Sequence, residues 1–251
     1  MVKNFYIIGH NPNTIEDVNK YLSNGANGIE PDICYHKDKP EKFYVHEDIE
    51  QIPDFIEDIF RSEYLSLTQY LNELKQLLFE KKYDLKIITF DLKPDYNYDI
   101  NELYKIIRDN FSLDFPDVKI ITTVSNPNGM EFLAKLNSTN PNEFVGVDEH
   151  AEPDEVNDFF KSKNLNHCFA AGSSVFSPGR DKFVERIQRA LELRDNGDFK
   201  FVHAWCVNDE DDMKEYLDLE KPIDAILTDE PDKLVSLIKS NAYSDKFNLD
   251  F

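Results

Sequence analysis

Short apolar runs alternate with amphipathic segments along the whole chain. Eight of these runs are rich in β-branched and aromatic residues, and each spans six to nine residues. Continuous apolar runs of this length are typical of parallel strands that are buried on both faces. They occupy residues 5–10, 28–35, 85–93, 119–125, 144–150, 167–173, 199–207 and 224–230.

Signals for helices lie between these runs. Thr14 is suited to cap a helix over 15–24, Asn101 follows a second helix start, and Pro153 opens an acidic first turn. Helical spacing of apolar residues also predicts helices over 180–194, 209–217 and 233–239.

Strands interleaved with helices indicate the α/β class and favour a closed (β/α)₈ TIM barrel over an open doubly wound sheet. A Rossmann fold is disfavoured because no Gly-x-Gly-x-x-Gly follows the first run. The segment 36–84 is longer than one crossover helix requires. We therefore expect a short excursion after strand 2, around 42–48, and then a Leu-rich helix near 66–81. Residues 1–251 are expected to form one barrel domain.

The net charge of −21 limits the range of partners. A chain this acidic, without a local basic stripe, repels polyanions and disfavours nucleic acid as a ligand. The same charge leaves at most transient contact with an anionic membrane. No stretch approaches the roughly 20 apolar residues of a membrane span, and the first residues do not form a signal peptide. We expect a monomer, cytoplasmic if Met1 is the natural start.

Three cysteines, Cys34, Cys168 and Cys206, occur without a Cys-x-x-Cys pair. Such a sparse, odd set argues against a disulfide framework and against a structural zinc site. Since all three lie in apolar runs, we expect buried, inert thiols.

Polar residues that a core would not tolerate lie at the ends of the first three predicted strands and of the excursion. In a barrel the C-terminal ends of the strands form the functional face. Glu30 and Asp32 are two residues apart, so both point to one face of a strand, and Asp91 and Lys93 repeat this spacing. The complete set of candidates is His10, Glu30, Asp32, His46, Asp91 and Lys93.

Three carboxylates without a nearby cysteine form a hard, oxygen-rich site that suits one Mg²⁺, with Ca²⁺ as the alternative. Lys93 adds a positive charge for a phosphoryl oxygen, and His10 and His46 supply acid–base or nucleophilic groups. Each residue alone also fits an ion pair or a loop contact, but their convergence favours a site. We interpret the remaining candidate histidines as structural: His36, His150 and His167.

The segment IIGHNPNTIEDVNKYLSNGANGIEPDICY (7–35) resembles the opening of the glycerophosphodiester phosphodiesterase superfamily. More narrowly, GANGIEPDI (25–33), the lone His46 and IITFDLKP (87–94) resemble the sphingomyelinase D/phospholipase D branch of spider venoms, actinobacteria and fungi. The segments FVGVDEH, FVHAWCVND and AILTDEPD are similar to later strands of the same fold, so the resemblance spans essentially the whole chain.

This resemblance implies roles for the candidates. His10 and His46 would be the catalytic pair, Lys93 would contact the phosphate, and Trp205 would line the headgroup pocket; the ligands of one Mg²⁺ would be Glu30, Asp32 and Asp91. It further implies that a substrate hydroxyl attacks its own phosphorus and expels the headgroup alcohol, which leaves a cyclic phosphate. An internal nucleophile has a large effective molarity. The resemblance also implies secretion.

The chain departs from that branch in several places. The segment EDIEQIPDF (47–55) directly after His46 contains no cysteine, where the venom enzymes have a disulfide-bound loop. The residues before Trp205 include His203 rather than a run of aromatics, although a choline cage needs aromatic faces. Asp229 stands where the branch often has Asn, which makes the expected headgroup pocket more acidic and favours a cationic headgroup such as ethanolamine. The tail 241–251 resembles only the start of the branch's C-terminal extension.

Three functions follow from these observations. The leading prediction is a phospholipase D-type lyase that acts on a sphingo- or lysophospholipid. The second is a hydrolytic glycerophosphodiesterase that acts on soluble diesters, and the third is a non-catalytic binding barrel. Retention of both histidines and all three carboxylates disfavours the third.

Overall fold

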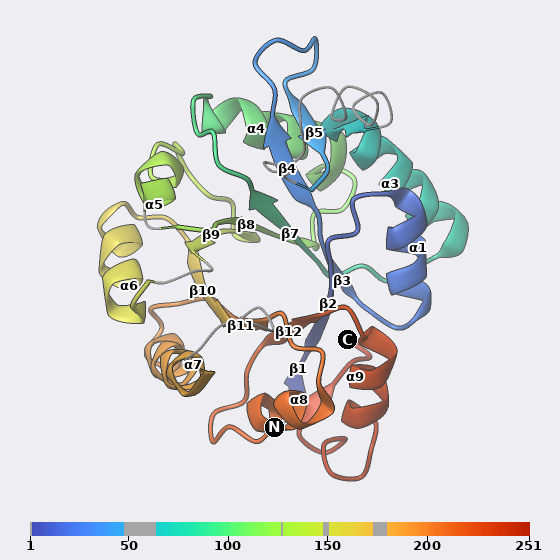
Figure 1. The fold of residues 1–251 in the computed structure, drawn as a ribbon, viewed down its shortest axis with the longest axis vertical. Helices are drawn as coiled ribbons and strands as arrows, with labels where there is room; N and C mark the ends of the chain where they lie inside the picture. The colour runs from blue at the N-terminus through green and yellow to red at the C-terminus, as the bar shows by residue number, and fades with distance from the viewer. Residues whose placement is uncertain (1, 48–63, 127, 148–150, 173–179) are drawn as a thin grey trace.

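Parallel strands close into a barrel with helices outside it (Figure 1). The computed structural model describes residues 2–47, 64–126, 128–147, 151–172 and 180–251. The wall runs in the order β3-β2-β12-β11-β10-β9-β8-β7, and a β3–β7 pairing closes it. The predicted (β/α)₈ TIM barrel is confirmed, and each predicted run supplies part of the wall. The strands are β2 (Tyr6–His10), β3 (Gly28–Glu30), β7 (Ile87–Leu92), β8 (Lys119–Val124), β9 (Glu143–Val147), β10 (His167–Gly172), β11 (Phe201–Trp205) and β12 (Ala225–Thr228).

The second apolar run forms two strands, β3 and β4 (Asp32–Tyr35), separated by Pro31. Proline has no N–H to donate to the ladder, which interrupts the pairing at that residue. The same register resumes beyond it, because Ile29 pairs with Ile88 and Asp32 pairs with Asp91. Glu30 and Asp32 therefore reach the same mouth of the barrel.

The excursion after this run is also confirmed. β4 pairs antiparallel with β5 (Phe43–Val45), and β5 pairs with β6 (Leu65–Ser66). The predicted Leu-rich helix follows as α3 (Leu67–Lys81), and a reciprocal cap between Ser66 and Gln69 fixes its start.

The other helices follow the predicted signals closely. The Thr14 side chain accepts a hydrogen bond from the Asp17 N–H, as the sequence predicts. Asp209 caps α8 (Glu210–Leu217) in the same way, by accepting from the Asp211 N–H. The pattern did not predict α5 or a π-helical turn at Arg108–Ser112. The helices are α1 (Ile15–Ser23), α4 (Ile100–Ile107), α5 (Asn128–Leu133), α6 (Pro153–Ser162), α7 (Arg180–Asp195), α8 (Glu210–Leu217) and α9 (Pro231–Ile238). Among the described residues, no helix is both long and apolar enough to cross a membrane.

The two ends of the chain meet beneath the barrel. β1 (Lys3–Asn4) pairs in parallel with β13 (Phe247–Asn248), and the Phe251 ring packs edge-on against Tyr6 at 5.1 Å between centroids. The tail thus closes the N-terminal end of the barrel.

An apolar cluster fills the lower interior of the ring, because alternate residues of each strand point inward. Its buried members are Tyr6, Ile8, Ile87, Ile121, Phe144, Cys168, Phe201, Ala225 and Leu227. With the floor occupied by these side chains, the inward-pointing polar residues collect at the C-terminal mouth.

Candidate functional site

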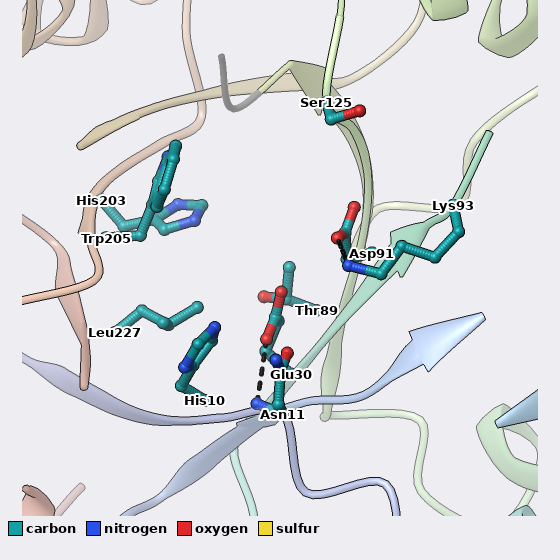
Figure 2. A pocket seen from close by; sticks show the side chains of 10 residues that line it. All are labelled: His10, Asn11, Glu30, Thr89, Asp91, Lys93, Ser125, His203, Trp205 and Leu227. Carbon is teal, nitrogen blue, oxygen red and sulfur yellow. Dashed lines mark hydrogen bonds and ion pairs between the residues drawn. The ribbon is translucent and has the colours of Figure 1, made fainter. Parts of the chain in front are cut away.

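A cavity of about 200 Å³ opens at the mouth of the barrel (Figure 2). Strand alternation explains its walls, since Thr89 and Asp91 both face it from β7, and His203 and Trp205 both face it from β11. Its lining consists of His10, Asn11, Glu30, Thr89, Asp91, Lys93, Ser125, His203, Trp205 and Leu227. Five of the eight residues predicted for the site thus meet in one pocket.

The three predicted metal ligands form a compact cluster. One carboxylate oxygen each from Glu30, Asp32 and Asp91 lies within 4.8 Å of the others, and all three residues are buried. Lys93 Nζ lies 2.8 Å from Asp32 Oδ1 and 2.5 Å from Asp91 Oδ2. Lys93 is therefore held by the carboxylates while its side chain still lines the pocket.

The charges in this cluster do not balance. Burial, together with the carboxylates of Asp91 and Asp32, holds the pKa of Glu30 well above its usual value. Burial alone would lower the pKa of Lys93, but Asp91 and Asp32 outweigh it and raise that pKa. Three ionised carboxylates and one ammonium leave two negative charges, which one divalent cation neutralises.

The remaining oxygens fit such a cation. Asp91 Oδ1 is buried and has no hydrogen-bond partner within the described residues. A buried carboxylate oxygen without a partner is costly, and hard oxygen donors suit Mg²⁺ or Ca²⁺. The cluster therefore has both the charge and a free ligand atom for a metal.

Two asparagines that the sequence analysis did not select hold these carboxylates. In the orientation that satisfies its side chain, the Asn11 amide donates to Asp32 Oδ1 and Glu30 Oε2, both at 3.2 Å. Asn13 donates to Asp32 Oδ2 at 3.1 Å and accepts from the Asp32 N–H at 2.8 Å. The Asn-Pro-Asn sequence directly after His10 was the available signal, because Asn tolerates the left-handed backbone that Asn11 adopts at φ 50°.

His10 is held from behind by Asp229, with 2.9 Å between Nδ1 and Oδ1. A carboxylate can only accept, so Nδ1 carries the hydrogen and Nε2 is left as an acceptor. Asn208 fixes the carboxylate, because its Nδ2 donates to Asp229 Oδ2 at 2.5 Å and its Oδ1 accepts from the Asp229 N–H at 2.8 Å. The hydrogen bond from His10 holds the pKa of Asp229 below its usual value.

Asp229 therefore lies behind His10 and not in the lining of the pocket, where the sequence analysis expected it. This position follows from the register between β12 and β2. Thr228 pairs with Gly9, so the residues that follow them, Asp229 and His10, lie side by side.

His46 does not line the pocket. Its Nδ1 lies 2.7 Å from the Glu47 carbonyl oxygen, its Nε2 lies 2.7 Å from His36 Nε2, and its ring stacks on Tyr64 at 4.1 Å. The structure thus separates the two predicted catalytic histidines. His36, which was interpreted as structural, directly contacts His46.

His167 and His150 are the other two histidines that were interpreted as structural. His167 is buried, with hydrogen-bond partners at 2.9 Å on both ring nitrogens, the Leu165 carbonyl and the Asn157 side chain. Its structural role is confirmed. His150 lies outside the described residues.

Two uncharged polar side chains, His203 and Thr89, line the pocket beside the apolar Leu227. Burial lowers the pKa of His203 to about 4, so its imidazole is neutral at physiological pH. His203 Nδ1 and Thr89 Oγ1 are buried and have no hydrogen-bond partner within the described residues. Trp205 and His203 face Asp91 and Lys93 across the cavity (Figure 2).

The cysteines differ from one another. Cys34 and Cys168 are buried, as expected, but Cys206 is only half-buried. Its Sγ lies 3.6 Å from Asp229 Oδ2 and 3.6 Å from Asn208 Oδ1. Burial and the Asp229 charge raise the pKa of this thiol to about 12. The expectation of a buried core thiol was wrong for Cys206, but its raised pKa keeps the thiol protonated.

Comparison with known proteins identifies the family. The family model described as "Dermonecrotic toxin SPH" matches residues 2–250. The chain belongs to this family. It is 28% identical over 272 residues to the dermonecrotic toxin LapSicTox-alphaII1 of Loxosceles apachea, covering 97% of this chain and 95% of the toxin. It is 23% identical over 270 residues to LarSicTox-alphaVII1 of Loxosceles arizonica, covering 97% and 96%.

Solved structures share the fold of this SPH-family chain. A phosphodiesterase from Oleispira antarctica, in complex with the product sn-glycerol-3-phosphate, has a TM-score of 0.64 at 16% identity and covers 94% of this chain and 97% of its own. A glycerophosphodiester phosphodiesterase from Agrobacterium tumefaciens has a TM-score of 0.59 at 15% identity and covers 96% and 100%.

Membership in the family confirms the resemblance on which the sequence analysis relied. The SPH-family chain is a phosphodiester-cleaving enzyme of the sphingomyelinase D/phospholipase D-like branch, and this family is metal-dependent.

Proposed function

We propose that the SPH-family chain cleaves a sphingo- or lysophospholipid with Mg²⁺, releases the headgroup alcohol and leaves a cyclic phosphate. One observation carries the proposal: His10, held by Asp229, shares a pocket with Glu30 and Asp91 of the buried carboxylate cluster. Mg²⁺ bound by this cluster would offset its charge and polarise the phosphoryl oxygens. A soluble diester cleaved by hydrolysis is the competing substrate class.

The protein's own groups move the protons. As the substrate hydroxyl attacks phosphorus, one histidine accepts its proton, the new O–P bond forms and the bond from phosphorus to the headgroup oxygen breaks. The other histidine donates a proton to the departing oxygen. His10 would take one of these steps through Nε2; the contact of its Nδ1 with Asp229, which keeps the hydrogen on Nδ1, supports this role. His46 takes the other step after its ring leaves His36.

Polar groups of the pocket recognise the headgroup. Trp205 offers a single aromatic face, and His203 and Thr89 offer unsatisfied polar atoms below it. A quaternary ammonium prefers several aromatic faces, whereas an ethanolamine ammonium can donate hydrogen bonds. We therefore expect ethanolamine headgroups to be preferred over choline.

Phosphorus NMR of products tests this function. The purified protein is incubated with Mg²⁺ and sphingomyelin, ceramide phosphoethanolamine, lysophospholipids or glycerophosphocholine. A cyclic phosphate from a lipid substrate in the first turnover is expected. Open-chain phosphomonoester alone contradicts the cyclising mechanism, and faster turnover of glycerophosphocholine than of lipid selects the hydrolytic function.

Variants of His10 and His46 test whether each histidine transfers one of the two protons. His10→Ala and His46→Ala are each expected to abolish turnover while circular dichroism remains unchanged. Substantial activity in either variant removes that histidine from the mechanism. We further propose that the protein is a monomer, which size-exclusion chromatography measures. We also propose that it acts outside the cell and contacts membranes only transiently, and vesicle sedimentation measures the membrane contact.

A further inference from the structure

A second group of possible ligands lies behind the catalytic pocket. One ligand atom each from His10, Cys206 and Asp229 lies within 4.8 Å of the others. His10 and Cys206 are half-buried and Asp229 is exposed, so an ion can reach them from solvent. This group combines nitrogen, sulfur and oxygen, whereas the buried cluster of Glu30, Asp32 and Asp91 offers oxygen alone.

The spacing of these atoms suits tetrahedral zinc. Zinc binds Cys sulfur at about 2.3 Å and His nitrogen or carboxylate oxygen at about 2.0–2.2 Å, so tetrahedral ligand atoms lie roughly 3.3–3.8 Å apart. Cys206 Sγ lies 3.6 Å from Asp229 Oδ2, and His10 Nδ1 lies 2.9 Å from Asp229 Oδ1. The two distances end on different oxygens of Asp229, and the ligand atoms of His10 and Cys206 lie within 4.8 Å of each other. Side-chain shifts of up to roughly one ångström would bring one atom of each group to tetrahedral spacing around one ion.

The charge also fits. A Cys206 thiolate and the Asp229 carboxylate together would neutralise one Zn²⁺. In the metal-free protein the thiol is protonated and lies 3.6 Å from Asn208 Oδ1, so the ion must displace the thiol proton when it binds. A magnesium ion has little affinity for thiolate, so the two clusters select different metals.

We propose that His10, Cys206 and Asp229 form a zinc site whose occupation inhibits the enzyme. Binding at Nδ1 places the single imidazole hydrogen on Nε2, and the thiol releases one proton to solvent. Nε2 then has no lone pair to accept a proton from a substrate hydroxyl, and Asp229 no longer orients His10. The site itself is independent of the proposed reaction, but its inhibitory effect rests on that reaction.

Cobalt spectroscopy tests the site without any substrate. Co²⁺ replaces Zn²⁺ in such sites, and bound thiolate gives it a near-ultraviolet charge-transfer band. We expect this band in the wild-type protein and in Cys168→Ala, which removes a fully buried thiol, but not in Cys206→Ser. Excess Mg²⁺ should leave the band in place and Zn²⁺ should remove it. A wild-type complex without the band, or an unchanged band in Cys206→Ser, overturns the proposal.

The inhibition is measured separately, at saturating Mg²⁺. Loss of an outer-shell partner alone weakens metal binding by about 10- to 100-fold, so loss of the thiolate should raise the half-inhibitory Zn²⁺ concentration by at least about tenfold. Equal inhibition of wild type and Cys206→Ser contradicts the inhibitory role. If the wild type cleaves none of the phosphodiesters, the proposed reaction fails and the cobalt result still decides the site.

Discussion

Replacing Glu30 by Gln should stabilise the metal-free protein and remove its response to metal. Glu30 lies within 4.8 Å of carboxylate oxygens of Asp32 and Asp91. At an effective dielectric constant of about 20, two unit charges at this separation repel by about 3–4 kcal/mol. Glu30 is repelled by both Asp32 and Asp91, and its attraction to Lys93 offsets roughly one of these two repulsions. Partial protonation relieves some of the rest, so we expect a gain of about 1–3 kcal/mol in the free energy of unfolding.

The pH dependence has a definite sign. The pKa of Glu30 is raised in the folded protein, so above the ordinary carboxyl value the folded state binds more protons than the unfolded state. The free energy of unfolding of the metal-free wild type therefore falls as pH rises from that ordinary value through the raised one. Its slope from this group is at most about 1.4 kcal/mol per pH unit. Burial also raises the pKa of Asp32, which contributes with the same sign. In Glu30→Gln the contribution of residue 30 is absent.

In the presence of metal, the wild type should become more stable than Glu30→Gln. A ligand at 100 times its Kd stabilises the folded state by about 2.7 kcal/mol, which raises Tm by roughly 5–11 °C for a chain of this size. Glu30→Gln lacks one charged ligand and should lose most of this increase.

The assay is urea and thermal unfolding at two pH values, in EDTA and in Mg²⁺. The matched control is Glu73→Gln, which removes an exposed carboxylate from helix α3 and should behave as the wild type does. If Glu30→Gln destabilises the metal-free protein, or if Mg²⁺ raises its Tm as much as that of the wild type, the charge argument is refuted.

Three further changes have definite expected outcomes. Arg108→Met should lower the free energy of unfolding by about 2–3 kcal/mol, because it removes the charged partner of the buried Glu143 at 2.8 and 2.5 Å and leaves that carboxylate two hydrogen bonds from Asn140. A loss below about 1 kcal/mol in urea unfolding contradicts this. Gly172→Ala places a Cβ 1.2 Å from the Trp205 carbonyl oxygen, so β10 and β11 must separate, and an unchanged Tm would disprove the clash. Asp229→Ala should lower kcat about 100-fold or more with a much smaller change in KM. An unchanged kcat would show that Asp229 does not orient His10. Asp229→Asn should retain part of the activity.

The sequence predicted the barrel because each wall strand is a continuous apolar run with polar residues at its end. It predicted the metal cluster for the same reason, since a two-residue spacing keeps Glu30 and Asp32 on one face. That inference holds even though Pro31 interrupts the pairing, because the register with β7 continues beyond it. Positions fixed by strand register can therefore be predicted without knowledge of side-chain contacts.

Other features depend on contacts that a single sequence does not encode locally. The pairing of Asp229 with His10 joins residues 219 positions apart and follows only from the closure of β12 against β2. The position of Cys206 beside Asp229 arises at the same junction, so an apolar neighbourhood in sequence wrongly indicated a core thiol. The contact between His36 and His46 depends on the hairpin in which β4 pairs antiparallel with β5, and the sequence predicted an excursion there without its pairing partners.

This distinction has an energetic consequence for catalysis. The carboxylates and His10 are held by the wall, whereas His46 follows β5 and contacts His36 and Tyr64. The proposed reaction requires His46 to leave these contacts. The hydrogen bonds of the His46 ring to His36 and to the Glu47 carbonyl are each worth about 1 kcal/mol. Its stacking on Tyr64 and on His36 is worth about 0.5–1.5 kcal/mol for each ring. Loss of these contacts costs about 3–5 kcal/mol, below the roughly 8 kcal/mol of a micromolar binding event. A substrate large enough to contact both the pocket and the hairpin can supply this energy from its remote groups. A small soluble diester that fills the pocket alone makes fewer such contacts, which favours the lipid as substrate.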